Sequence, residues 1–244
     1  MSIGKLFIQD FRNIESVTVD FHSDVNFIIG DNGSGKSSVL EAIFYLGHGK
    51  SFRSAKVDNL LQHEKSTFTV SVRTDKDCQL GVRKGFNSSA NSSEIRIDGE
   101  NQTKFSSLAK NVAVQVITPE SFIVFFGGPK QRRRFIDLGL FHVKHSFADH
   151  WREFSRILKQ RNACLRSKTD LATLNYWTEI FAESSEQIAR HRAEYVSELT
   201  NELSFWLKIM LPSVSDDIVI QYLQGWNSKK ALLDNYYIEN ISYM

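Results

Sequence analysis

A short segment of glycine, lysine and hydroxyl side chains has the composition and spacing to bind a chain of phosphates. Residues 30–37 read Gly-Asp-Asn-Gly-Ser-Gly-Lys-Ser, which matches the pattern G-x-x-x-x-G-K-[ST]. In such a loop the glycines let several main-chain N–H groups point at one anion. Lys36 would reach the β- and γ-phosphates of a nucleotide, and the Ser37 hydroxyl would ligate Mg²⁺. The residues expected to bind are Gly30, Asp31, Asn32, Gly33, Ser34, Gly35, Lys36 and Ser37.

The segments on both sides of this loop have the character that phosphate binding requires. The apolar run 25–29 precedes it and is suited to a buried strand, and residues 36–46 carry apolar side chains at helical spacing. Strand, glycine loop and helix in this order place the positive end of the helix dipole against the phosphates. The alternative is a chance match in a turn rich in glycine and serine, which both flanks disfavour.

Length and composition are those of a soluble globular protein of one or two domains. The 244 residues are 41% hydrophobic and 24% charged, an ordinary balance for this class. No apolar run approaches the roughly 18 residues of a membrane span. The N-terminus lacks the apolar core of a secretory signal, and Cys78 and Cys164 form no C-x-x-C pair, so we expect a cytoplasmic chain. Because the net charge is only +2, binding to nucleic acid would depend on local basic patches.

Elements around the loop follow from hydrophobic periodicity. Strands are expected at 5–11, 15–21, 67–73, 94–97, 111–117 and 217–223. The character of the sequence changes near residue 120, and from about Gln131 the pattern becomes helical. One helix is expected near 134–143, and Asp149 is expected to cap a second. A third pattern, about 173–210, would be roughly 50 Å long if it is one helix. The alternative is two shorter helices broken near Ser184-Ser185.

Two groups of basic residues are candidate contacts to the phosphate backbone of DNA. At a helix start, cations oppose the helix dipole, which favours a functional reason for the first group. The alternative for both groups is an ordinary solvent-exposed helix face. The candidates are Lys130, Arg132, Arg133 and Arg134 after Gly127-Gly128-Pro129, and Arg152, Arg156 and Lys159 on the next helix.

Further strings complete a set of motifs that spans nearly the whole chain. They are Phe11-Arg12-Asn13-Ile14, residues 46–53, Ile117-Thr118-Pro119-Glu120, residues 127–137 and residues 158–163. Together with the phosphate loop, this set closely resembles the bacterial RecF family of recombination mediators, which is related to Rad50 and to the SMC ATPases. The F-R-N, G-G-P-x-x-R-R and L-K-Q-R-N strings distinguish this family from other proteins with a phosphate loop.

The resemblance implies an α/β fold, in which a P-loop NTPase head of the ABC/SMC type with flanking antiparallel strands is joined to a helical second domain. Residues 1–125 would form the N-terminal part of the ATP-binding head, 126–212 the helical arm domain, and 213–244 the incomplete start of a segment returning to the head. By analogy with related heads, Arg12 and Asn13 would lie near the nucleotide base or ribose.

The resemblance also implies a function in recombinational DNA repair, replication-gap processing and SOS induction. Proteins of this family bind ATP with Mg²⁺ and form an ATP-dependent homodimer. They bind single-stranded DNA and gapped or double-stranded DNA, and with RecO and RecR they help to load RecA. Full-length members are expected to be weak DNA-dependent ATPases.

The sequence departs from the family in the parts that hydrolyse ATP. ABC-like heads need a strand ending in Asp-Asp or Asp-Glu, and a Ser-rich signature. The run 112–117 ends in Thr118-Pro119-Glu120, and Ser215-Asp216-Asp217 precedes its apolar run, so neither substitutes. We therefore assign no catalytic residue and expect a C-terminally truncated chain. Three hypotheses remain open: a RecF-type ATPase, a non-catalytic nucleotide- and DNA-binding fragment of it, and another P-loop protein such as an SMC-like ATPase or a small kinase.

Overall fold

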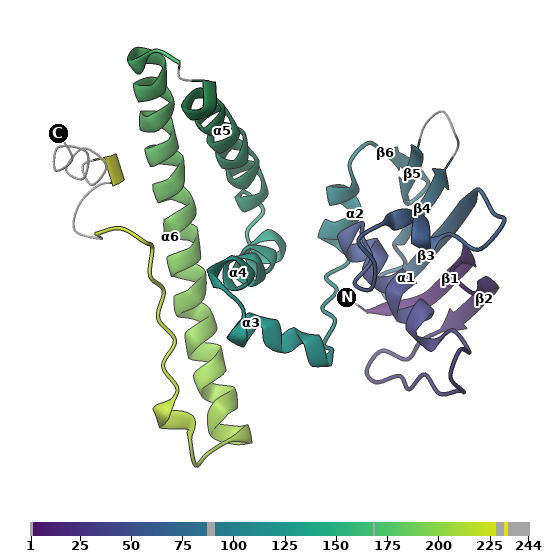
Figure 1. The fold of residues 1–244 in the computed structure, drawn as a ribbon. Coiled ribbons are helices and arrows are strands. Elements are labelled where there is room, and N and C mark those ends of the chain that lie inside the picture. Colours follow the sequence, from purple (N-terminus) through teal and green to yellow (C-terminus); the bar gives the residue numbers. More distant parts are fainter. Residues whose placement is uncertain (1, 87–90, 168, 228–231, 234–244) are drawn as a thin grey trace. The chain divides into compact units, whose positions relative to one another are not determined.

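The computed structural model describes residues 2–86, 91–167, 169–227 and 232–233 (Figure 1). The chain divides into two units, Met1–Ser121 and Phe122–Met244. The boundary expected at residues 125 and 126 lies close to this division. The expected returning segment, 213–244, falls within the second unit, and its residues 228–231 and 234–244 are outside the described part of the chain.

The first unit is built on an antiparallel sheet of six strands in the order β2-β1-β3-β4-β5-β6 (Figure 1). Its elements are β1 (Ile3–Phe11), β2 (Ile14–Asp20), α1 (Lys36–His48), β3 (Thr67–Thr74), β4 (Gln79–Phe86), β5 (Asn91–Ile97), β6 (Glu100–Gln102) and α2 (Phe105–Asn111). A short 3₁₀ helix, Val57–Leu60, lies between α1 and β3.

One face of this sheet forms the core of the first unit. The register pairs Ile8 of β1 with Val70 of β3, and Val70 with Val82 of β4, and all three are buried. Because successive side chains along a strand point to opposite faces of the sheet, the residues between these buried ones lie on the other face. Helices α1 and α2 pack against this core through buried residues that include Ala42, Leu46 and Leu108.

The alternating runs predicted as strands at 5–11, 15–21, 67–73 and 94–97 are confirmed as β1, β2, β3 and β5. Strand β4 and helix α2 were not predicted. In β4 the apolar residues Leu80 and Val82 do alternate. Gly81 between them and Gly85 near the end of the strand obscure the pattern. Glycine at these positions contributes no side chain from which the period can be read.

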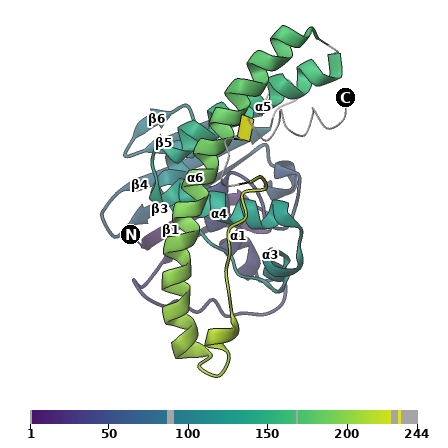
Figure 2. The same cartoon turned by 90° about the vertical axis from the view of Figure 1, so that its left-hand side faces the viewer.

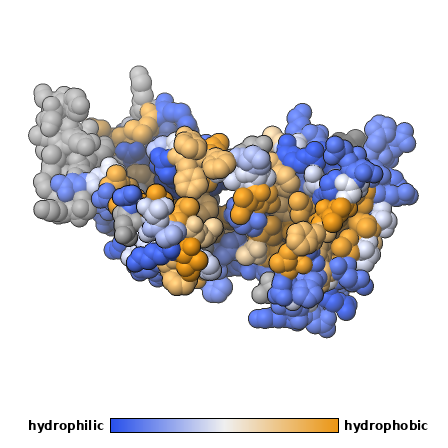
Figure 3. All heavy atoms as spheres, turned by 90° about the horizontal axis from the view of Figure 1, so that it is seen from below, coloured by the Kyte–Doolittle hydropathy of each residue, from blue (hydrophilic) through white to orange (hydrophobic). Residues whose placement is uncertain are grey.

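The strands expected at 25–29, 111–117 and 217–223 are wrong, since the structure assigns none of these segments to a strand. Phe27 and Ile29 are 84% and 90% exposed, and Ile117 and Val219 are 85% and 84% exposed. A strand requires a hydrogen-bonded neighbour, and none of these segments joins the sheet formed by the described residues. Figure 3 shows hydrophobic side chains on the surface of the protein.

The second unit is helical. It contains α3 (Ile123–Phe126), α4 (Pro129–Val143), α5 (Phe147–Ser167) and α6 (Leu171–Met210), with the short 3₁₀ segment Ser215–Asp217 after α6. Another 3₁₀ segment, Pro119–Phe122, begins in the first unit and ends at the first residue of the second. Helix α5 packs along α6, and the chain after α6 doubles back alongside it (Figures 1 and 2). The buried residues Leu140, Phe147 and Ile188 join α4, α5 and α6 in one core.

The long helix α6 is continuous over 40 residues, so the prediction of a single helix is confirmed. At 1.5 Å per residue it is about 60 Å long. The alternative break at Ser184-Ser185 does not occur, and both hydroxyls donate to the carbonyl of Phe181 without interrupting the helix. Its first turn is capped by Asp170, whose Oδ1 accepts from the Thr173 N–H at 2.9 Å.

Two predicted helix starts need correction. Helix α4 begins at Pro129, earlier than the expected residue 134, because proline is well suited to the first helical position. Helix α5 begins at Phe147, so Asp149 is not its cap and instead lies in the first turn. There its carboxylate pairs with Arg152 at 2.9 Å.

Candidate phosphate-binding site

The glycine-rich loop leads directly into helix α1. Gly35 is the N-cap residue and has φ 97°, a left-handed conformation that an L side chain would strain. The first turn of α1 has neither a side-chain cap nor an acidic residue. Its N–H groups and the positive end of its dipole are therefore available to an anion.

Lys36 is held over the loop by the main chain. Its Nζ donates to the carbonyl oxygens of Gly30 and Asp31, each at 2.7 Å. These contacts keep the ammonium group beside the cavity that the loop encloses. Ser37 is exposed at the start of the helix, so its hydroxyl is accessible. The structure thus brings the predicted lysine and serine to the same helix N-terminus.

The cavity beside the loop has a volume of about 290 Å³ and is polar. Its lining residues are Asn13, Asn32, Gly33, Ser34, Gly35, Lys36, Ser37, Ser38 and Arg53. Main-chain N–H groups, an ammonium, hydroxyls and a guanidinium face it, and the described lining residues include no carboxylate. This donor set suits a phosphate chain, and a serine hydroxyl beside it suits Mg²⁺ bound to that chain. The residues present therefore fit a nucleotide and Mg²⁺.

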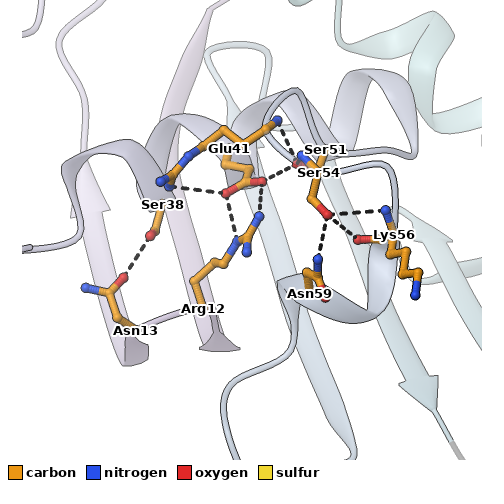
Figure 4. Close-up of polar contacts among 9 residues, drawn as sticks. Arg12, Asn13, Ser38, Glu41, Ser51, Ser54, Lys56 and Asn59 are labelled. Atoms are coloured by element: carbon orange, nitrogen blue, oxygen red, sulfur yellow. Dashed lines mark hydrogen bonds and ion pairs between the residues drawn. The ribbon is translucent and has the colours of Figure 1, made fainter.

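The two polar residues of the F-R-N string make different contacts (Figure 4), and only one of them lines this cavity. Asn13 lines it, and its amide Nδ2 donates to the Gly33 carbonyl at 2.8 Å while its Oδ1 accepts from the Ser38 hydroxyl at 2.7 Å. Asn13 thereby ties the turn between β1 and β2 to the phosphate loop. Arg12 is not among the lining residues. Its guanidinium donates to Glu41 at 3.0 and 2.7 Å.

Arg53 is a lining residue that sequence reasoning did not single out. It lies in the segment after α1, and its side chain is 51% exposed. Ser51 shapes this segment, because its Oγ accepts from the main-chain N–H groups of Arg53 and Ser54 at 2.9 and 2.8 Å. The signal in the sequence was a cation in a glycine-punctuated polar segment directly after the phosphate-loop helix.

The basic candidates lie on exposed surfaces of α4 and α5. On α5, Arg152, Arg156 and Lys159 recur at helical spacing on one exposed stripe, although Arg152 is paired with Asp149. On α4, Arg132 donates to the carbonyls of Gly127 and Phe125 at 2.8 and 3.3 Å, so part of its hydrogen-bonding capacity is used internally. The remaining α4 candidates, Lys130, Arg133 and Arg134, are exposed.

None of the described helices combines the length and the apolar character needed to cross a membrane.

Comparisons with known proteins agree on one family. The model of the RecF/RecN/SMC N terminal domain matches residues 2–204. A Colwellia psychrerythraea protein described as DNA replication and repair protein RecF is 54% identical over 235 residues, which are 96% of this chain and 62% of the relative. A Shewanella halifaxensis protein with the same description is 38% identical over 99% of this chain and 67% of the relative.

A solved structure described as the recombination mediator protein RecF-ATP in the RecFOR pathway has the same fold. The TM-score is 0.75 at 24% sequence identity, and the match covers 86% of this chain and 58% of the other. The likeness confirms the predicted fold class, an ATPase head of the RecF and SMC type with antiparallel strands and a helical second part. The chain spans only part of its relatives, 62% of the length of the Colwellia protein.

Proposed function

The chain belongs to the RecF family of the RecF/RecN/SMC N-terminal domain proteins, and from this premise we propose that it binds ATP with Mg²⁺ at the phosphate loop and binds DNA through its helical unit. Membership in this family removes the small-kinase alternative. The observation that carries the proposal is the cavity at the N-terminus of α1, lined by Lys36, Ser37 and the glycine loop.

Each group in this cavity has a role in the proposed binding. The ammonium of Lys36 would exchange its two carbonyl contacts for oxygens of the β- and γ-phosphates. The hydroxyl of Ser37 would hold Mg²⁺, which neutralises part of the charge of the phosphate chain when it is bound. The N–H groups of Gly33 to Lys36 would complete the cradle, while Asn13 and Arg53 would face the nucleotide from outside the loop.

The wider function proposed is that of a cytoplasmic recombination mediator. In this role an ATP-dependent homodimer binds single-stranded and gapped or double-stranded DNA, acts with RecO and RecR in loading RecA, and serves recombinational repair, replication-gap processing and SOS induction. Two observations support it. The relatives are described as DNA replication and repair proteins, and cations that include Arg133 and Arg156 are exposed on α4 and α5.

Nucleotide binding is tested by calorimetric titration of ATP with Mg²⁺ into the protein and into a Lys36→Ala variant. Loss of one charge-assisted donor to the phosphates, a contact of about 1.5–3 kcal/mol, should raise the Kd roughly 10- to 150-fold. Lys110→Ala removes an exposed lysine of α2 in the same unit and serves as the matched control. An equal Kd for the protein and the Lys36→Ala variant would refute the assignment of the phosphate loop.

The same pair of variants decides between turnover and binding alone. Release of inorganic phosphate that depends on Lys36 would favour a RecF-type ATPase, whereas ATP binding without phosphate release would favour the non-catalytic module.

DNA binding is tested separately by titration into labelled gapped DNA at several salt concentrations. Replacing Arg133, Arg134 and Lys130 with alanine should weaken binding and reduce its salt dependence, since each phosphate contact adds about one unit to the slope.

A further inference from the structure

A fully buried carboxylate lies on α1, the helix that follows the phosphate loop, and contacts Arg12 and Ser51 (Figure 4). Glu41 of α1 is 0% exposed, and its side chain meets residues from two other segments. On one side it accepts the forked hydrogen bonds of Arg12, from the turn between β1 and β2. On the other side it accepts a hydrogen bond from the Ser51 hydroxyl and lies 3.8 Å from the guanidinium of Arg53. A buried charge requires such partners, because removal from water is costly.

The two arginines are held with very different strength. Arg12 approaches Glu41 at 2.7 and 3.0 Å in a forked geometry, and its side chain is only 22% exposed. Arg53 approaches at 3.8 Å, beyond hydrogen-bond distance, and its side chain is 51% exposed. Arg12 is therefore the partner that neutralises Glu41. The guanidinium of Arg53 stays available to the cavity that it lines.

Two of the residues that line the cavity, Asn13 and Arg53, lie outside the phosphate loop and α1. The backbone position of each depends on contacts with Glu41. Arg12 has φ 56°, a conformation that is uncommon for a non-glycine residue, and its bond to Glu41 fixes the turn that carries Asn13. Asn13 in turn accepts from Ser38 and donates to Gly33. On the other side, Ser51 donates to Glu41 while accepting from the N–H of Arg53. The carboxylate of Glu41 is thus bonded both to the turn that carries Asn13 and to the segment that carries Arg53.

We propose that Glu41 is a positioning residue, which holds the segment from Gly49 to Ser54 against the nucleotide site through Ser51 and so presents Arg53 to the bound phosphates. The inference rests on the nucleotide binding proposed above. A phosphate chain in the cavity attracts Arg53 away from its weak contact with Glu41. The Ser51–Glu41 hydrogen bond keeps the backbone in place while the guanidinium turns, so binding orders one side chain and not the whole segment.

The test removes the Ser51 hydroxyl and leaves Glu41 and its pair with Arg12 intact. The variants are Ser51→Ala, Ser51→Thr, which restores a hydroxyl, and Ser54→Ala. Ser54 is the matched control, because its hydroxyl contacts Lys56 and Asn59 in the same region and not Glu41 (Figure 4). Calorimetric titration measures the Kd for ATP with Mg²⁺, and hydrogen exchange measures protection of residues 49–54 with and without ATP.

Ser51→Ala is expected to raise the Kd for ATP about tenfold, since it removes a hydrogen bond to a charged group that preorganises the site. Ser51→Thr should restore the affinity to within about twofold, and Ser54→Ala should change it by no more than about threefold. Residues 49–54 should be protected in the original protein even without ATP, because Ser51 already holds their backbone, whereas in Ser51→Ala their protection should depend on ATP. The unfolding midpoint without ligand should also fall in Ser51→Ala, because Glu41 loses one hydrogen bond, so the changed protection of residues 49–54 is the readout specific to positioning.

Failure of this inference differs from failure of the proposed function. If ATP binds and depends on Lys36 while Ser51→Ala binds as tightly as the original protein, Glu41 does not position the segment and nucleotide binding stands. Equal losses in Ser51→Ala and Ser54→Ala would also overturn the inference, because they would assign the effect to general order in the segment. Absence of ATP binding in the original protein would refute both. Glu41→Gln should weaken ATP binding more than Ser51→Ala, since it also releases Arg12.

Discussion

The ion pair between α4 and α6 offers a sharp test of what holds the helical unit together. Asp137 accepts from Nε and Nη2 of Arg192 at 2.7 and 2.8 Å, and Oδ2 also accepts from the indole N–H of Trp151 at 3.3 Å. The Arg192 and Asp137 side chains are 14% and 18% exposed. The substitution Asp137→Asn keeps the size of the side chain but turns an amide donor toward the donors of Arg192.

The expected loss of unfolding free energy in Asp137→Asn follows from how deeply the ion pair is buried. Removing one partner of a fully buried pair costs about 3–5 kcal/mol, because the other charge is left without compensation. Some water reaches this pair, so we expect Asp137→Asn to lower the free energy of unfolding of the helical unit by about 2–4 kcal/mol. For a unit of this size the loss corresponds to a fall of about 10 °C in the unfolding midpoint.

Tryptophan fluorescence reports on the unfolding of the helical unit alone. All 4 tryptophans, Trp151, Trp177, Trp206 and Trp226, lie in the second unit, so their emission during thermal or urea unfolding does not report on the sheet. Asp149→Asn is the matched control. It breaks the exposed pair with Arg152, whose side chains are 69% and 56% exposed, and should cost less than about 1 kcal/mol.

A double replacement separates the unpaired charge from the lost contact. Asp137→Leu with Arg192→Met removes both charges, and apolar replacement of a buried pair is often neutral, so it should recover most of the stability lost in Asp137→Asn. If Asp137→Asn unfolds within about 2 °C of Asp149→Asn, burial of the pair does not govern its contribution and the reasoning fails.

Three further predictions concern pH, backbone strain and surface composition. Burial lowers the pKa of His191 from its usual 6.5, and the positive charges of Lys144 and His150 add to the effect, so the unfolded chain binds a proton there more readily than the folded chain. The free energy of unfolding of the helical unit, followed by tryptophan fluorescence, should therefore fall as the pH decreases below 6.5. The fall should be smaller in His191→Asn. Gly49 has φ 63° and an added Cβ would lie 3.0 Å from the Phe105 ring, so Gly49→Ala should cost about 1–3 kcal/mol by circular dichroism. Gly99→Ala, with φ 83° and no atom within 4 Å of an added Cβ, should show the strain alone. Phe27 is 84% exposed, so Phe27→Ser should change stability by less than about 0.5 kcal/mol and reduce aggregation measured by light scattering.

The fold was predictable where local pattern and packing agree. The alternation in β1, β2 and β3 indicates one buried face, and these strands do pair through Ile8, Val17 and Val70. The long α6 was predictable because its apolar spacing continues through Ser184-Ser185. The runs 25–29, 111–117 and 217–223 were misread because apolar composition reports a tendency to be buried, whereas strand formation depends on a neighbour elsewhere in the chain.

The site was predictable in part for a similar reason. The phosphate loop is a local device, so residues 30–37 contain nearly all the information needed to recognise it. Glu41, Ser51 and Arg53 come together only in the folded chain, where Glu41 also contacts Arg12 from the turn between β1 and β2, and no local pattern pairs them. One signal was present in the sequence: Glu41 lies within the apolar run 39–43, and an acidic side chain on the packed face of a helix requires a partner.

The phosphate loop of this protein is positioned from its helix side. The segment before it, 25–29, is exposed and belongs to no strand among the described residues, yet the loop that follows still leads into a well-packed α1. Its supports are the Asn13 amide on Gly33 and the anchoring of α1 through buried Ala42 and Leu46. Since Arg12 fixes the turn that carries Asn13 and is itself fixed by Glu41, helix and turn are joined by one buried ion pair. Disturbing that pair should therefore alter the loop more than changing the exposed apolar residues before it.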